Sequence, residues 1–201
     1  MQKQDRPVAF FDSGLGGISV LRETVRLLPQ ENYLYYGDSL HAPYGVKSEA
    51  QIQALSLAAA EHLVSAGAKA IVVACNTATS AAIGLPCEGL MEFVERGELR
   101  GSAVEAYLAE KLAPYLREPV DGIVLGCTHY PFLTGAIRRI VGPGPEIMDG
   151  SHGVAMQLAR KLAENGMLRS SDAPGTAVFE NSLDEPEILA LSRALFRYQD
   201  E

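Results

Sequence analysis

The sequence of 201 residues contains no tryptophan, few basic residues and only three cysteines. No apolar run approaches the ~18 residues typical of a membrane span, and residues 1–6 are polar with no apolar signal segment behind them. An odd number of cysteines without such a signal favours free thiols in a reducing cytoplasm. With 17 Lys and Arg against 25 Asp and Glu, the net charge of −8 argues against nucleic-acid binding. We therefore expect a cytoplasmic protein with neither a membrane nor a nucleic-acid partner.

The composition, 47% hydrophobic and 21% charged, is typical of a globular protein with a substantial core. Short apolar runs alternate with longer amphipathic stretches, which predicts an α/β fold with parallel strands and crossover helices. The predicted strands are residues 8–11, 33–36, 70–74, 122–126 and 177–179. The predicted helices are residues 48–66, 102–117, 151–166 and 185–198, with Ser102–Glu105 as a capping box and Ser151 as a further cap.

Two cysteines occupy equivalent places. Cys75 follows one predicted strand and Cys127 follows another, each after a small residue and before polar residues suited to start a helix. This is the edge of a parallel sheet at which ligands bind, and a helix N-terminus favours the thiolate. Two thiols facing one pocket would remove a proton from one face of a carbon and return it to the other. Cys87 lacks this context and is interpreted as structural.

The first predicted strand leads into a glycine-rich stretch, residues 13–17. Such glycines permit a tight turn and close approach to an anion at the next helix N-terminus. A dinucleotide fingerprint is disfavoured because Ser19 stands where the third glycine is needed, although Asp38 lies about 20 residues on. A zinc site is also disfavoured, since the cysteines and histidines lack ligand spacing.

Five motifs together resemble those of bacterial glutamate racemases, and they occur in the family's order. They are Phe-Asp-Ser-Gly-Leu-Gly-Gly at 11–17, Tyr-Gly-Asp at 36–38, Pro-Tyr-Gly at 43–45, Cys-Asn-Thr-Ala at 75–78 and Gly-Cys-Thr-His-Tyr-Pro at 126–131. The resemblance implies a cofactor-independent racemase that supplies D-glutamate for peptidoglycan, and it leaves a homodimer open.

The resemblance also assigns roles. Cys75 and Cys127 match the two acid/base thiols, acting on D- and L-glutamate respectively, and Asp12 and His129 match the residues that assist them. The positions matching substrate contacts are Asp12, Ser13, Pro43, Tyr44, Gly45, Asn76, Thr77, Thr128 and His129. Backbone N–H groups, hydroxyls and an amide at helix N-termini can hold the carboxylates, so an acidic protein can bind glutamate.

One departure concerns the junction between Gly84 and Leu85, where about two βα units of the family, on the order of 50 residues, have no counterpart. We predict two similar parallel-sheet α/β domains with the active site in the cleft between them. The first comprises residues 1–84 and 149–201, and the second, truncated, comprises residues 85–148.

Three alternatives remain open at this point. A related racemase could act on aspartate or another amino acid. A catalytically inactive protein could retain a glutamate site if the segment is truly deleted. A nucleotide-binding dehydrogenase is the most distant alternative.

Overall fold

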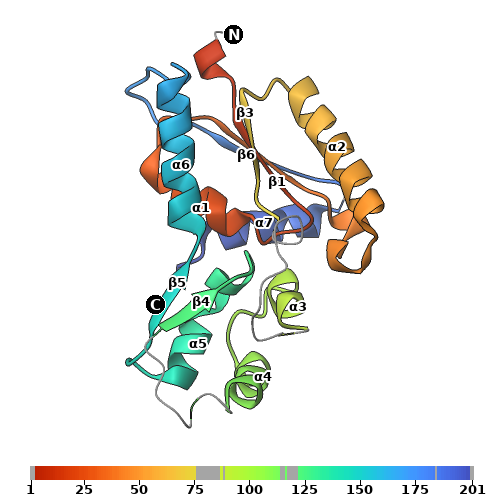
Figure 1. Cartoon of the computed structure of the whole chain (residues 1–201), viewed down its shortest axis with the longest axis vertical. Helices are drawn as coiled ribbons and strands as arrows, with labels where there is room; N and C mark the ends of the chain where they lie inside the picture. The colour runs from red at the N-terminus through yellow and green to blue at the C-terminus, as the bar shows by residue number, and fades with distance from the viewer. Residues whose placement is uncertain are drawn as a thin grey trace.

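The computed structural model describes residues 3–75, 87, 89–113, 116, 122–183 and 185–199. Its larger sheet has four parallel strands in the order β3-β1-β2-β6 (Figure 1). These strands are β1 (Val8–Asp12), β2 (Tyr33–Gly37), β3 (Ala70–Val73) and β6 (Ala177–Asn181). All five residues of β1 are buried, as expected for a central strand covered on both faces.

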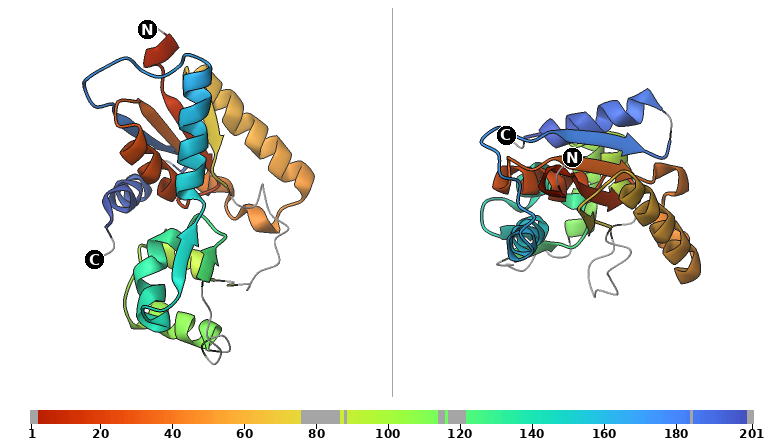
Figure 2. Two further views of the ribbon diagram at one scale, coloured as in Figure 1. Left: turned by 60° about the vertical axis from the view of Figure 1, so that its left-hand side comes forward. Right: turned by 90° about the horizontal axis from the view of Figure 1, so that it is seen from above.

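Alternating side chains divide the core between the two faces of this sheet. Val8 and Phe10 of β1 belong to a large hydrophobic cluster, whereas Ala9 and Phe11 belong to a smaller one. Figures 1 and 2 show α2 on one side of the sheet and α1 and α6 on the other. The larger cluster is covered by α1 (Ile18–Leu27), α6 (Ser151–Glu164) and α7 (Pro186–Arg197), and the smaller one by α2 (Glu49–Ser65).

The described residues of a second body, in the lower half of Figure 1, form two parallel strands and three α-helices. The strands are β4 (Gly122–Leu125) and β5 (Glu146–Asp149), and the helices are α3 (Leu90–Glu95), α4 (Ser102–Leu112) and α5 (Thr134–Val141). Short 3-10 helices span Lys3–Asp5, Ser39–His41, Tyr44–Val46 and Tyr130–Leu133.

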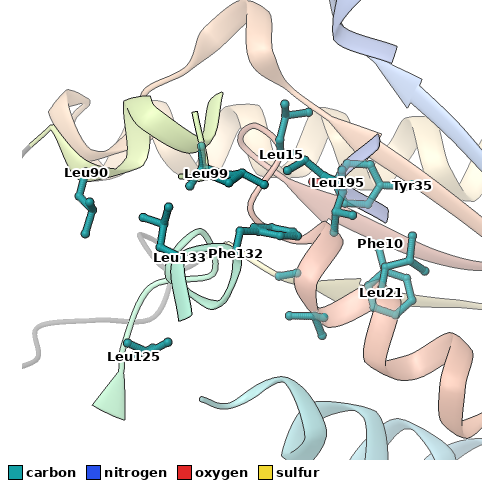
Figure 3. Close-up of a cluster of buried hydrophobic side chains, with 14 of the residues drawn as sticks. Phe10, Leu15, Leu21, Tyr35, Leu90, Leu99, Leu125, Phe132, Leu133 and Leu195 are labelled. Atoms are coloured by element: carbon teal, nitrogen blue, oxygen red, sulfur yellow. The ribbon is translucent and has the colours of Figure 1, made fainter. Parts of the chain in front are cut away.

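The large hydrophobic cluster continues from the first sheet into this second body. Leu15 and Leu195 lie beside Leu99 and Phe132 in Figure 3, and all four belong to the same cluster. The two bodies therefore share one continuous apolar core. Within the described part of the chain, no helix has the length and apolar character needed to cross a membrane.

The predicted α/β class with parallel sheets is confirmed, and so are the five predicted strands, but two predicted helix caps are wrong. Ser102 and Ser151 are the first helical residues, and the capping positions belong to Gly101 and Gly150. Gly101 has φ of 112°, a backbone conformation that glycine accommodates, so it ends the preceding loop. Glu105, the other half of the expected capping box, instead pairs with Arg139 at 2.8 Å.

A capping box does occur, at a place where it was not predicted. The Ser48 hydroxyl accepts a hydrogen bond from the backbone N–H of Gln51, and the Gln51 side chain accepts one from the backbone N–H of Ser48. These two bonds satisfy N–H groups that α2 would otherwise leave without partners.

A buried ion pair ties together the end of the first sheet that lies away from the cysteines. Lys69 Nζ donates to Glu31 Oε2 at 2.5 Å, and their side chains are 0% and 2% exposed. Lys69 also donates to the carbonyl oxygens of Gln4 and Met167, while Glu31 Oε1 accepts the backbone N–H of Arg169. The pair thus joins the starts of β2 and β3 to the segments before β1 and after α6.

We predict that Lys69→Met lowers the free energy of unfolding by about 3–5 kcal/mol, because it leaves the Glu31 carboxylate buried without its cation. Denaturant unfolding measures the loss. The matched control is Lys161→Met, whose partner is Glu164 in a pair 55% and 46% exposed; its loss should stay within ~1 kcal/mol. Equal losses in the two variants would contradict this account.

Candidate active site

Cys75 and Cys127 line a single cavity of about 390 Å³. Cys75 follows the end of β3, and Cys127 follows the end of β4, so each sheet places one thiol at the carboxyl end of a parallel strand. The carboxyl edge of parallel strands is the usual position of a ligand site in an α/β protein. The sequence-based expectation that the two thiols share a pocket therefore agrees with this geometry.

The Cys75 thiol is 5% exposed and packs in the smaller hydrophobic cluster with Phe11 and Tyr44. Its Sγ donates to the Ser13 hydroxyl oxygen at 3.4 Å. Ser13 comes from the loop after β1, the strand beside β3. Neighbouring parallel strands therefore bring a predicted substrate contact next to a predicted catalytic thiol.

The loop after β2 is held by a buried carboxylate, Asp38. The Tyr44 hydroxyl donates to Asp38 Oδ2 at 2.7 Å, and the His41 Nδ1 lies 2.8 Å from Asp38 Oδ1. Sequence reasoning found no role for His41. Pro43 and Gly45 are exposed and are not among the described residues that line the cavity.

On the Cys127 side, His129 lies between the thiol and a carboxylate. Its Nδ1 is 3.7 Å from the Cys127 Sγ, and its Nε2 is 2.7 Å from Glu95 Oε1. The same Glu95 oxygen accepts the backbone N–H of Leu15 at 3.0 Å. Sequence reasoning did not identify Glu95. None of the five motifs contains this residue.

Burial and charge shift the pKa values of two groups here. Burial opposes the charge on His129, but hydrogen bonds to Cys127 and Glu95, with the nearby Asp12 carboxylate, raise its pKa to about 10. Burial also raises the pKa of Asp12 to about 6, against the opposing effects of His129 and the backbone N–H of Gly14. Both pKa values are thus raised, which favours the imidazolium form of His129 and the protonated form of Asp12.

The glycines after β1 permit close contact between the two bodies. A Cβ on Gly14 would come within 2.5 Å of Glu95 Oε1, and one on Gly16 would overlap the side chains of Thr128 and His129. The Ser19 hydroxyl donates to the Thr128 carbonyl oxygen at 2.8 Å. These glycines therefore lie against side chains of the second body, and their close approach to a bound anion stays a prediction.

The remaining predicted substrate contacts and the third cysteine lie in different places. Thr128 lines the cavity with the two cysteines, whereas Asn76 and Thr77 lie outside the described residues. Cys87 packs against the large cluster, and burial raises the pKa of its thiol, in keeping with a structural role. Among the described residues, no group of His, Cys, Asp and Glu has the arrangement of a metal site.

No protein-family model matches the sequence. A glutamate racemase of Clostridium perfringens is 41% identical, with 96% of each chain covered. The chain belongs to the glutamate racemase family. Its fold also resembles a Thermus thermophilus glutamate racemase solved with β-chloro-D-alanine, with a TM-score of 0.82, 28% identity and coverage of 100% of this chain and 96% of that one. A Francisella tularensis glutamate racemase with D-glutamate, at 22% identity and covering 98% of this chain and 95% of that one, has the same fold with a TM-score of 0.79.

The alignment with the Clostridium perfringens glutamate racemase contains an internal difference in length. It extends over 251 positions, against 201 residues in this chain, so at least 50 positions of that relative have no counterpart here. The missing internal segment predicted from the motifs is therefore confirmed. The predicted junction between Gly84 and Leu85 lies outside the described residues.

We predict that His129 stays protonated until the pH approaches about 10, compared with 6.5 for an unperturbed histidine. Because the folded-state pKa is raised, the stability that this proton contributes is fully present below pH 6.5 and is lost as the pH rises through about 10. An NMR titration of the imidazole, with unfolding measured across that range, checks both statements.

Glu95→Gln removes a negative charge from His129 Nε2, so it should lower the pKa of His129. The matched control is Glu92→Gln, an exposed carboxylate on the same helix. A pKa near 6.5 in the unmodified protein, or the same titration in Glu95→Gln, would contradict this prediction.

Proposed function

We propose that this chain interconverts L- and D-glutamate, with Cys75 and Cys127 as the two acid/base groups. The observation that carries the proposal is that one cavity is lined by both thiols, each from a different sheet. A racemase acting at a single carbon needs a proton acceptor on one face and a donor on the other. Family membership at 41% identity supports glutamate as the substrate.

In the proposed reaction, one cysteine is a thiolate and the other a thiol. Cys75 takes the α-proton of D-glutamate, and Cys127 delivers its own proton to the opposite face of the carbanion, which gives L-glutamate and a Cys127 thiolate. The reverse reaction starts from that thiolate. Each direction leaves the pair ready for the other, so no net proton is consumed.

Different neighbours assist the two thiols. The Cys127 sulfur faces His129, whose charge is maintained by Glu95, and a cation beside a thiol stabilises the thiolate. Cys75 instead contacts the neutral hydroxyl of Ser13. Asp12 follows Phe11 at the end of β1, and burial raises the pKa of its carboxyl group, which favours a proton on it and suits it to assist proton transfer.

The amino and carboxylate groups of the substrate would be held by the polar residues around the thiols. Thr128 in the cavity and Ser13 beside Cys75 support this part of the proposal. The full proposed set of substrate contacts is Asp12, Ser13, Pro43, Tyr44, Gly45, Asn76, Thr77, Thr128 and His129.

Membership of the glutamate racemase family also supports a proposal for the cellular role and the domain boundaries of this chain. The enzyme would act in the cytoplasm without a cofactor and supply D-glutamate for peptidoglycan, and a homodimer stays open. Its site would lie between one domain of residues 1–84 and 149–201 and another of residues 85–148.

The central test is α-proton exchange of L- and D-glutamate in deuterated water, followed by NMR and by circular dichroism of the substrate. The purified chain should catalyse both exchange and racemisation without added pyridoxal phosphate. Cys75→Ser and Cys127→Ser should each lower racemisation at least ~100-fold, because each removes one acid/base group.

Cys87→Ser is the matched control, since this thiol packs away from the cavity, and it should retain activity. Full activity in both the Cys75 and Cys127 variants would refute the two-thiol mechanism. Faster turnover of aspartate than of glutamate would refute the substrate assignment. Glutamate-dependent thermal stabilisation without any exchange would instead identify a binding protein.

A further inference from the structure

A second cavity, of about 320 Å³, lies between α1 and α7 and shares no described lining residue with the cavity of the two thiols. Its volume falls within the range of roughly 300–1,000 Å³ that is usual for small-molecule sites. The C-terminal halves of two helices packed against each other form its wall. The described lining residues are Arg22, Val25, Arg26, Phe196, Arg197, Tyr198 and Gln199.

Positive charge dominates this cavity. Three of its described lining residues are arginines, and none of them is acidic. Arg22 and Arg26 stand one turn apart on the same face of α1, and Arg197 is the last residue of α7. Because the guanidinium group stays charged throughout the physiological pH range, the cavity offers a ligand three cations in a chain whose net charge is −8.

The carboxylate nearest to these arginines is only loosely paired with them. Arg26 Nη1 lies 3.5 Å from Glu23 Oε2, whereas Arg96 and Arg139 each contact a carboxylate oxygen at 2.7 and 2.8 Å. The other oxygen of Glu23 lies 3.0 Å from His152 Nδ1. Since the Arg26 side chain is 63% exposed, its contact with Glu23 contributes little, and a guanidinium has further N–H donors for a ligand.

Arg22 is held in position by an aromatic ring of the second body. Its Cζ lies 5.5 Å from the centre of the Phe132 ring, and Phe132 is fully buried. This cation–π contact reduces the conformational freedom that Arg22 would lose on binding a ligand. Arg26 and Arg197, each in the last turn of a helix, also offset the helix dipoles, but that effect does not account for Arg22 in the middle of α1.

The chemistry of the wall favours a phosphate group. Paired N–H donors of a guanidinium match two oxygens of a phosphate, and a dianion is attracted by three cations more strongly than a single carboxylate is. Val25 and the ring of Phe196 add apolar surface to the lining, which an organic group attached to the phosphate would cover.

We propose that the cavity between α1 and α7 binds a phosphate dianion on Arg22, Arg26 and Arg197, either as free phosphate or as the phosphate group of a small organic molecule. This site is separate from the two thiols. The inference therefore goes beyond the proposed function and does not depend on it.

Isothermal titration calorimetry of the purified chain with inorganic phosphate and with phenyl phosphate, at constant ionic strength, tests the proposal. Both probes should bind at a single site. Tighter binding of phenyl phosphate identifies an organic phosphate as the ligand, because its ring would cover Val25 and Phe196. Equal or tighter binding of inorganic phosphate identifies the free ion.

Arg26→Gln and Arg197→Gln should each weaken the binding of both probes about fivefold or more, because each variant removes a charged donor. Both side chains are exposed, so both variants should fold. The matched control is Arg160→Gln, which removes the same charge from a 61% exposed position on α6 outside this cavity. It should leave both affinities unchanged.

Three results would overturn the proposal. The first is that neither probe binds. The second is an equal loss of affinity in Arg160→Gln, which would show an adventitious ion only, attracted by positive charge in general. The third is displacement of the probes by L-glutamate, which would place them in the cavity of the thiols. None of these measurements requires racemisation, so the proposed function is tested independently.

Discussion

A single carboxylate oxygen, Oε1 of Glu95, holds the two halves of the site together. It accepts the backbone N–H of Leu15 from the first body at 3.0 Å and contacts His129 Nε2 of the second at 2.7 Å. With Nε2 fixed on Glu95, the other ring nitrogen faces the Cys127 sulfur. A Cβ at position 14 would come within 2.5 Å of the same oxygen, so the carboxylate would have to move from this position. The glycine-rich loop after β1 therefore also helps to position His129, through the Glu95 carboxylate.

The features that the sequence predicted well are local ones. Strands such as β1 and β2 are continuous apolar runs, and their burial on both faces follows from that pattern. A cysteine directly after such a strand lies at the carboxyl edge wherever the strand sits in its sheet. The positions of Cys75 and Cys127 beside one cavity were predictable for this reason.

The features that were not predicted depend on distant parts of the chain. Glu95 is 34 residues from His129 and 80 residues from Leu15, and no spacing rule links them. Strand β5 has the sequence Glu-Ile-Met-Asp with mostly exposed residues, so it has no apolar run to reveal it. The predicted caps at Ser102 and Ser151 were wrong because each helix begins at the serine itself, so the glycine before it takes the capping position.

The chain is shorter than its relatives, yet the contacts of both cysteines lie within its described residues. Cys75 contacts Ser13, Cys127 contacts His129, and His129 contacts Glu95, and all of these described residues lie on one side or the other of the predicted junction. The part of the cavity wall that β4 forms is partly exposed. Within the described residues β4 pairs with β5 alone, and its Val124 is 74% exposed at the cavity. In the described chain the two thiols therefore keep their polar neighbours, and β4 forms one edge of the cavity that they share.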